Sequence, residues 1–254
     1  MIAVQLYTVR TQLQDPARLG DVLGRLREIG YRAVEVAGLG PAATARFGTE
    51  LRRADLIACA AHVSLDRLTT DLEAVAGECK DWGCQYVVIP SIPDADRTGE
   101  GFHRFETEAG ELAHRLRADG LRLAYHNHAY ELERFGGKTG LEVIFDSSPQ
   151  TLQAELDTYW LQFGGVNPAT WIRRLGGRVP LVHLKDMAVD RGNPVDAEVG
   201  EGNLDWMDIL RACRDAGTEW LVVEQDNPRR DPMESVAISY VNLATMTAKF
   251  GWGG

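Results

Sequence analysis

Residues 220–224 read WLVVE, four apolar side chains followed by a carboxylate. The stretch LVHL at 181–184 has the same apolar character and carries a histidine. Runs this apolar are typical of parallel strands that are covered on both faces. Eight strand-like runs occur along the chain, at residues 2–6, 33–36, 57–62, 86–89, 121–126, 152–156, 181–184 and 220–224.

Longer amphipathic stretches separate these runs. Residues 16–29 place apolar side chains on one helical face, with Asp15 as the expected N-cap and Gly30 as the C-terminal stop. Comparable helices are expected at 66–82, 101–119, 204–216 and 232–250. Eight alternations of strand and helix predict an α/β fold, a parallel (β/α)8 or TIM barrel. No linker marks a boundary, so we expect one domain over residues 1–254.

Composition limits the classes of partner. The chain has 254 residues, of which 44% are hydrophobic and 25% charged, and its formal net charge is -10. Nucleic-acid binding relies on clustered Lys and Arg, so this charge argues against a nucleic-acid partner. No apolar run reaches the length of about 18 residues that a membrane span needs, so we expect no membrane partner either. A small polar molecule is the expected ligand, and a homo-oligomer is compatible with the sequence.

The N-terminus and the cysteines indicate the compartment. The first ten residues, MIAVQLYTVR, resemble a first strand more than a signal peptide, which predicts a cytoplasmic protein. The four cysteines, Cys59, Cys79, Cys84 and Cys213, are scattered without Cys-x-x-Cys spacing. We expect them to be reduced and structural.

Four strand ends carry side chains that bind metals. They belong to the stretches YHNHAYE at 125–131, ELD at 155–157, VHLK at 182–185 and VVEQ at 222–225. The carboxyl ends of the strands of a barrel meet at one face. Glu131, Asp157, His183 and Glu224 are therefore predicted to bind one divalent ion, and three carboxylates with one imidazole suit Mn²⁺, Co²⁺, Mg²⁺ or Zn²⁺.

Each of these residues has a structural alternative. Asp157 could cap the next helix, His183 could be a hydrogen-bonded core histidine, and Glu224 could be a buried protonated acid. Within YHNHAYE, His126 is the rival of Glu131 for the remaining ligand position, because it lies closer to the strand end.

Further polar residues are expected at the same mouth. Lys185 lies two residues after His183 and so on the same face, where its ammonium could hold a substrate oxyanion, carboxylate or phosphate. Its structural alternative is an ion pair with a rim carboxylate such as Asp186 or Glu201. Glu35 and His62 end the second and third strands and are predicted, with His128, to bind substrate hydroxyls. For Glu35 and His62, a hydrogen bond at the rim is an equal alternative.

Two connections are unusually long, at 129–139 and 187–203. Long loops after barrel strands lie over the active-site face, so both are predicted to form walls or a lid. Gly200, Gly202 and Asn203 should let the second loop turn sharply.

The motifs together resemble the xylose-isomerase-like barrel superfamily, in the branch called sugar phosphate isomerases/epimerases. They are QLYTVR at 5–10, GYRAVEVAG at 30–38, AYHNHAYEL at 124–132, ELDTYW at 155–160, VHLKDM at 182–187, GEGNLDW at 200–206 and VVEQD at 222–226. The resemblance implies a metal site of Glu, Asp, His and Glu, of which the last three correspond to Asp157, His183 and Glu224. Ketose 3-epimerases of the superfamily carry Glu where His126 stands, so the first ligand is either Glu131 or a histidine.

The resemblance also implies an activity, that of a metal-dependent isomerase or epimerase of a keto-sugar or related polyol. A proton leaves the carbon next to a carbonyl through a metal-stabilised enediolate, with Glu131, Glu224 and His126 as the proposed catalytic groups. Members with a YHNH motif resemble, besides isomerases, two kinds of lyase: inosose dehydratases and enzymes that cleave 3-keto-glycosides. In that alternative, His126 or His128 is the acid or base.

Two other hypotheses belong to different classes of protein. A non-catalytic sugar-binding barrel would retain the pocket without exchanging protons. A DNA-repair endonuclease of the same superfamily is disfavoured by the net charge of -10.

Overall fold

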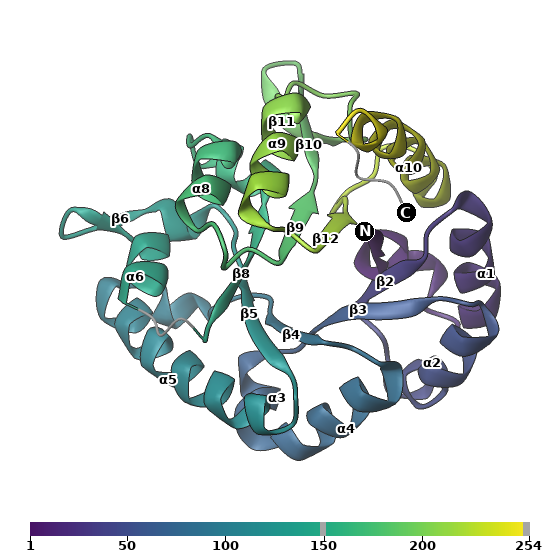
Figure 1. Ribbon diagram of the computed structural model, residues 1–254, viewed down its shortest axis with the longest axis horizontal. Coiled ribbons are helices and arrows are strands. Elements are labelled where there is room, and N and C mark those ends of the chain that lie inside the picture. The colour runs from purple at the N-terminus through teal and green to yellow at the C-terminus, as the bar shows by residue number, and fades with distance from the viewer. Residues whose placement is uncertain (148–150, 251–254) are drawn as a thin grey trace.

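The computed structural model describes residues 1–147 and 151–250. Eight parallel strands close into one barrel in the order β1-β12-β9-β8-β5-β4-β3-β2, and helices surround it (Figure 1). The strands are β1 Ile2–Gln5, β2 Ala33–Val36, β3 Ile57–His62, β4 Tyr86–Ile89, β5 Arg122–His126, β8 Gln153–Asp157, β9 Leu181–Leu184 and β12 Trp220–Val223. The predicted (β/α)8 fold is confirmed.

The helices on the outside are α1 Leu19–Ile29, α2 Pro41–Arg53, α3 Leu65–Thr70, α4 Leu72–Trp82, α5 Gly99–Ala118, α6 Gly140–Ser147, α7 Thr158–Phe163, α8 Pro168–Arg174, α9 Trp206–Ala216 and α10 Pro232–Ala248. The helix predicted at 66–82 is wrong in one respect, because Asp71 interrupts it with non-helical φ -143° and ψ 43°. Asp71 therefore separates α3 from α4. None of the described helices is long and apolar enough to cross a membrane.

Local signals position the first helix as expected. Asp15 accepts a hydrogen bond from the backbone of Ala17 at 2.9 Å, and Pro16 opens a short 3₁₀ turn before α1. Gly30 ends α1 with φ 129°, and a side chain there would collide with the ring of Tyr240. The backbone and the packing at this position both require glycine.

Inward positions of the barrel change from apolar to ionisable along several of its strands. Successive side chains of a strand alternate between its faces, so residues two apart point the same way. The inner apolar cluster includes Leu181, Trp220 and Val222, and the residues two further along β9 and β12 include His183 and Glu224. The barrel therefore has an apolar lower half and an ionisable upper half, at the carboxyl ends of its strands.

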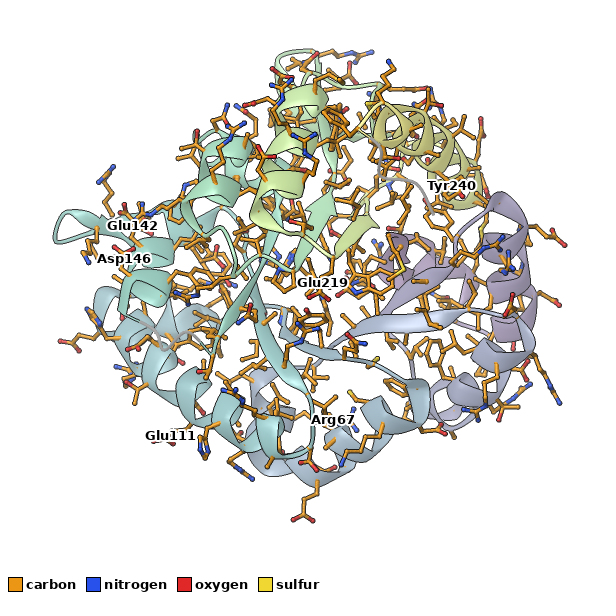
Figure 2. All side chains as sticks on the ribbon, viewed as in Figure 1. Arg67, Glu111, Glu142, Asp146, Glu219 and Tyr240 are labelled. Atoms are coloured by element: carbon orange, nitrogen blue, oxygen red, sulfur yellow. The ribbon has the colours of Figure 1, made fainter. Side chains whose placement is uncertain are left out.

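The opposite end of the barrel is closed by a surface ion pair. Glu219, labelled near the centre of Figure 2, lies 3.0 Å from Arg122. The guanidinium of Arg122 also lies 4.0 Å from the ring centre of Tyr86. Glu111, on the outer helix α5, lies at the outer edge of the molecule in the same view, and Arg67 on α3 pairs with Glu78 on α4. The charges on the inside are thus a separate group, confined to one end.

Both long connections contain short hairpins. The first carries β6 Arg134–Phe135 and β7 Lys138–Thr139, and the second carries β10 Asp186–Asp190 and β11 Asn193–Ala197. The fully buried carboxylate of Asp186 fixes the second connection by accepting hydrogen bonds from five donors. These are the backbone amides of Met187, Gly200, Gly202 and Leu204 and the indole of Trp206.

Candidate metal centre and substrate cavity

Four buried side chains at the barrel mouth have the composition of a metal site. His126, Asp157, His183 and Glu224 each offer a ligand atom, and these atoms all lie within 4.8 Å of one another. Two imidazoles and two carboxylates suit a divalent transition metal or zinc. Three of the four residues belong to the set predicted from the sequence, and His126 stands in the place predicted for Glu131.

Asp157 caps a helix with one carboxylate oxygen and turns the other towards the site. Its Oδ1 accepts a hydrogen bond from the backbone of Trp160 at 2.9 Å and caps α7. Its Oδ2 lies 3.2 Å from Nζ of Lys185. Burial raises the pKa of Asp157 to about 7, with Lys185 opposing the shift and Glu224 adding to it. Capping uses one oxygen and leaves the other available to the site.

Glu224 and Lys185 form the charged centre of the mouth. Nζ of Lys185 lies 2.8 Å from Glu224 Oε2 and 2.6 Å from Asp226 Oδ2, and the lysine side chain has no exposed surface. Burial opposes ionisation of Glu224, but Lys185 and His183 outweigh it and hold the pKa of Glu224 well below its usual value. Lys185 thus pairs with three acids of the site, whereas the sequence suggested Asp186 or Glu201 as its alternative partners.

Glu131 lies outside the group of close ligand atoms. Its Oε1 accepts a hydrogen bond from the hydroxyl of Tyr125 at 2.5 Å, and its Oε2 accepts one from the backbone of His128 at 2.9 Å. Burial raises the pKa of Glu131 to about 7, although the two hydrogen bonds oppose the shift. The Tyr125 hydroxyl in turn lies 3.1 Å from that of Tyr130. Glu131 is therefore connected to the mouth only through tyrosine hydroxyls and the backbone.

A second group of ionisable side chains lies next to the first. His62, His126, Glu155 and His183 also offer ligand atoms within 4.8 Å of one another. Glu155 was not predicted from the sequence, yet its position two residues before Asp157 on the same strand places it on the same face. Glu35, predicted to bind substrate, is fully buried and lies 2.5 Å from the ring of His183 through Oε2.

A cavity of about 500 Å³ opens beside these residues. Four predicted site residues line it: His62, His126, His128 and Glu224. The other lining residues are Tyr7, Ala37, Gly38, Pro90, Ser91, Arg97, Tyr130 and Asp226. Glu35 and Lys185 are not among the described residues that line this cavity. Both are buried, Glu35 in a hydrogen bond with Gln5 and Lys185 in an ion pair with Glu224.

One wall of the cavity is a stack of planar groups that was not predicted from the sequence. The guanidinium of Arg97 lies 3.7 Å from the ring centre of Tyr130. Tyr130 stacks on His128 at 5.6 Å between ring centres, and His128 lies 5.4 Å from Trp160. Burial lowers the pKa of His128 to about 2, so this ring is neutral at physiological pH. The first long loop supplies Tyr130 and so contributes to the wall, as predicted.

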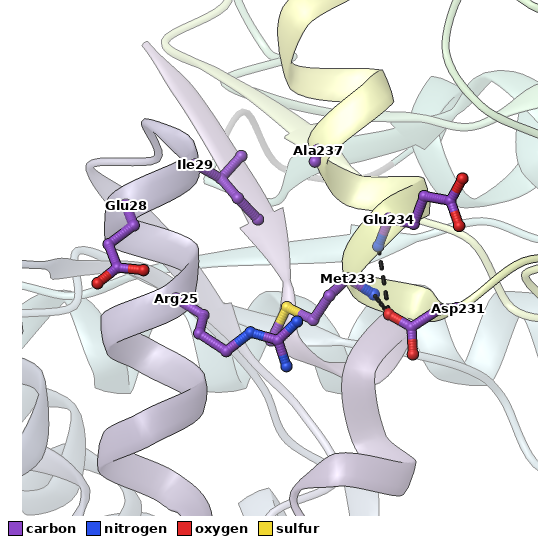
Figure 3. Close-up of a pocket in the computed structure, with 7 residues that line it drawn as sticks. All are labelled: Arg25, Glu28, Ile29, Asp231, Met233, Glu234 and Ala237. Atoms are coloured by element: carbon purple, nitrogen blue, oxygen red, sulfur yellow. Dashed lines mark hydrogen bonds between the residues drawn. The ribbon is translucent and has the colours of Figure 1, made fainter.

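Another hollow of similar size lies between α1 and α10 (Figure 3). Asp231 Oδ1 there accepts hydrogen bonds from the backbone of Met233 and Glu234, which caps α10. Among its described lining residues there is no histidine and no group of metal ligands. The chemistry is therefore concentrated at the barrel mouth.

Comparisons with known proteins agree with this architecture. Rhizopine catabolism protein MocC of Rhizobium meliloti is 28% identical over 181 residues, which cover 61% of this chain and only about half, 52%, of MocC. The inosose dehydratase of Geobacillus kaustophilus is 23% identical over 264 residues, which cover 88% of this chain and 84% of that enzyme. The crystal structure of a sugar phosphate isomerase/epimerase from Parabacteroides distasonis superimposes with a TM-score of 0.80 at 20% identity, covering 96% of this chain and 97% of that one.

The family is shown by one further match. The family model described as xylose isomerase-like TIM barrel matches residues 23–240, which is most of the chain. This match confirms the resemblance seen in the sequence motifs. The protein belongs to the xylose isomerase-like TIM-barrel family.

Proposed function

We propose that this protein is a metal-dependent isomerase or epimerase of a keto-sugar or related polyol. The observation that supports it most is the convergence of His126, Asp157, His183 and Glu224, four buried ligands of mixed oxygen and nitrogen type, beside a cavity of sugar size. These four would hold one divalent ion. When bound, such an ion would polarise the carbonyl of a hydroxy-carbonyl substrate. Mn²⁺, Co²⁺, Mg²⁺ and Zn²⁺ are the candidate ions.

Glu224 is the proposed base that removes the proton next to the carbonyl. It lines the cavity, and Lys185 and His183 keep it ionised despite burial. Its Oε2 lies 2.8 Å from Nζ of Lys185 and 3.1 Å from Nδ1 of His183, so Oε1 is the oxygen proposed to take the proton. Proton transfer by a positioned group contributes roughly 10² to 10⁴-fold to a rate.

A second proton-carrying group must act after the proton has left. His62 lines the cavity from β3, and although burial opposes its protonation, Glu35 and Glu155 raise the pKa of His62. We propose that His62 returns a proton to the substrate, and that His128 binds a hydroxyl. The assignment of Glu131 as ligand and proton carrier, made from the sequence, stays a prediction, but the position of Glu131 favours His126 as the ligand.

A lyase on the same site is the second candidate. The likeness to inosose dehydratase over 88% of the chain favours it. The first step would be the same proton removal by Glu224, after which a leaving group departs with a proton from His62. The enzyme class therefore depends on the fate of the intermediate after proton removal.

The test is incubation of the metal-loaded protein with keto-sugars and inososes in D₂O, and then NMR of the products. Deuterium at the carbon next to the carbonyl, with an isomeric product, supports the isomerase. An unsaturated or shortened product identifies the lyase. The Glu224→Gln variant and metal-stripped protein serve as controls, and both should lose the exchange. Tight binding of sugars without any exchange by the loaded wild type would contradict both reactions and leave a sugar-binding barrel.

A further inference from the structure

The ring of His183 lies between carboxylates on both sides. Its Nδ1 is 3.1 Å from Glu224 Oε2, within the proposed ligand group. Its Nε2 is 2.5 Å from Glu35 Oε2 and 3.1 Å from Glu155 Oε2. A neutral imidazole carries its proton on one nitrogen and offers the other to a metal. The nitrogen that carries the proton is therefore the one that has a hydrogen-bond acceptor beside it, and the other nitrogen is left for the metal.

Glu35 is held in place for this contact. Nε2 of Gln5 donates a hydrogen bond to the same Oε2 at 2.9 Å, and Gln5 is the direct neighbour of Glu35 across β1 and β2. Oε1 of Gln5 accepts in turn from the backbone of Tyr7 at 3.3 Å. Gln5, Glu35 and His183 have no exposed surface. A buried acceptor that is fixed on both sides defines one orientation of the imidazole.

We propose that Glu35 is a positioning residue whose Oε2 accepts the Nε2–H of His183, so that Nδ1 of His183 is the atom presented to the metal. Histidines that bind metals commonly donate their other N–H to such a carboxylate, which fixes the tautomer and raises the basicity of the ligand. This inference rests on the metal centre of the proposed function. It also places Glu35 behind the metal site, in contrast to the substrate-binding role predicted from its position at a strand end.

The same logic assigns the second group of close ligand atoms. Oε2 of Glu155 lies 2.8 Å from Nε2 of His62 and 3.1 Å from both Nδ1 of His126 and Nε2 of His183. The carboxylate thus lies among three imidazoles, on the side of His183 away from Glu224. We infer that Glu155 orients the imidazole rings of His62, His126 and His183, which face the cavity or the metal site.

The experiment compares Zn²⁺ affinity and histidine tautomers among variants. Affinity is measured by competition with a chelator of known affinity for wild type, Glu35→Gln, Glu35→Ala and Glu198→Gln. Glu198 is a matched control, because it is a buried glutamate that contacts Ser235 at 2.7 Å and Arg230 at 3.0 Å, away from the site. Loss of the carboxylate in Glu35→Ala should weaken Zn²⁺ binding about 10- to 100-fold.

The conservative variant and the spectrum give a readout that a purely structural role would not move. Glu35→Gln keeps a neutral acceptor, so its affinity should fall between those of wild type and Glu35→Ala, while Glu198→Gln should bind as wild type does. In ¹⁵N NMR of the Zn²⁺-loaded wild type, His183 should carry its proton on Nε2.

Three outcomes would overturn the inference. If Zn²⁺ binds wild type and both Glu35 variants equally well, or if His183 of the loaded protein carries its proton on Nδ1, the positioning role is wrong while the metal centre stands. If wild type binds no Zn²⁺, the metal centre fails and the positioning role with it. If Glu35→Ala does not fold, the ¹⁵N spectrum of the loaded wild type and the Zn²⁺ affinity of Glu35→Gln still test the positioning role.

Discussion

Replacing Lys185 with methionine should destabilise the metal-free protein strongly. The methionine has nearly the same length and shape, so the change removes the charge with little loss of packing. Lys185 is fully buried and lies 3.2, 2.8 and 2.6 Å from Asp157, Glu224 and Asp226. Removing one partner of a buried ion pair costs about 3–5 kcal/mol, because the remaining charge is left uncompensated. We expect a loss of this size in the free energy of unfolding.

The expected loss depends on pH and on metal. The pKa of Asp157 is already raised to about 7 by burial, and without the ammonium that opposes this shift the acid takes up a proton more readily. A protonated Asp157 needs no counter-cation, so Lys185→Met should lose less at acidic pH than at alkaline pH. A saturating divalent metal should restore stability, because it supplies positive charge to Asp157 and Glu224.

The assay is urea unfolding monitored by far-UV circular dichroism, in chelator and in excess Mn²⁺. Lys80→Met is the matched control: Lys80 makes the same kind of contact, with Asp119 at 2.6 Å, but its side chain is 52% exposed. Exposed pairs of this type contribute about 0–1 kcal/mol. If Lys185→Met lost no more stability than Lys80→Met, the claim that Lys185 neutralises the buried acids would be refuted.

Two further predictions concern Glu131 and the glycines. Burial raises the pKa of Glu131 to about 7 from its ordinary 4.5, so the folded protein keeps a proton that the unfolded chain loses in this window. Stability should therefore fall as pH rises from 4.5 to about 7, and Glu131→Gln should reduce this slope in unfolding experiments across that range. Gly202→Ala should destabilise by about 1–3 kcal/mol, because its Cβ would collide with the carboxylate of Asp186 and the carbonyl of Met187. Gly24→Ala, where a Cβ meets nothing within 4 Å in the middle of a helix, should be neutral or stabilising in the same assay.

The barrel could be predicted from the sequence because strands covered on both faces are largely apolar. The eight predicted runs correspond to the eight barrel strands, with ends that differ by at most two residues. Helices without a clear apolar stripe or with few residues were not located from the sequence. Among these are α2 (Pro41–Arg53), whose buried face mixes Phe47 and Leu51 with Ala43, Gly48 and the charged Glu50, and α7 (Thr158–Phe163), which has six residues.

The candidate site was only partly predictable, for a geometric reason. Asp157, His183 and Glu224 end apolar strands, where period-two alternation places them inside the barrel. Glu131 comes after the strand has ended, and from that point the sequence no longer defines where a side chain points. In the structure its carboxylate turns back to Tyr125 and the backbone of His128.

Partners across the barrel were not predictable at all. Lys185 was correctly placed on the face of His183, yet its contacts with Asp226 and Glu224 depend on the pairing of β9 with β12. The stack of Arg97 on Tyr130 joins two different loops. Contacts between segments far apart in the chain leave no periodic signal in the sequence.

The most direct test of the central claim is the metal content, by elemental analysis, of wild type beside His126→Ala, Asp157→Asn and Glu131→Ala after loading with Mn²⁺. Asparagine retains an oxygen that can cap α7, so Asp157→Asn tests the ligand role with the helix cap preserved. We predict about one ion per chain in wild type and in Glu131→Ala, and loss of the ion in the other two variants. Wild type without metal, or His126→Ala and Asp157→Asn with undiminished metal, would contradict the proposed centre.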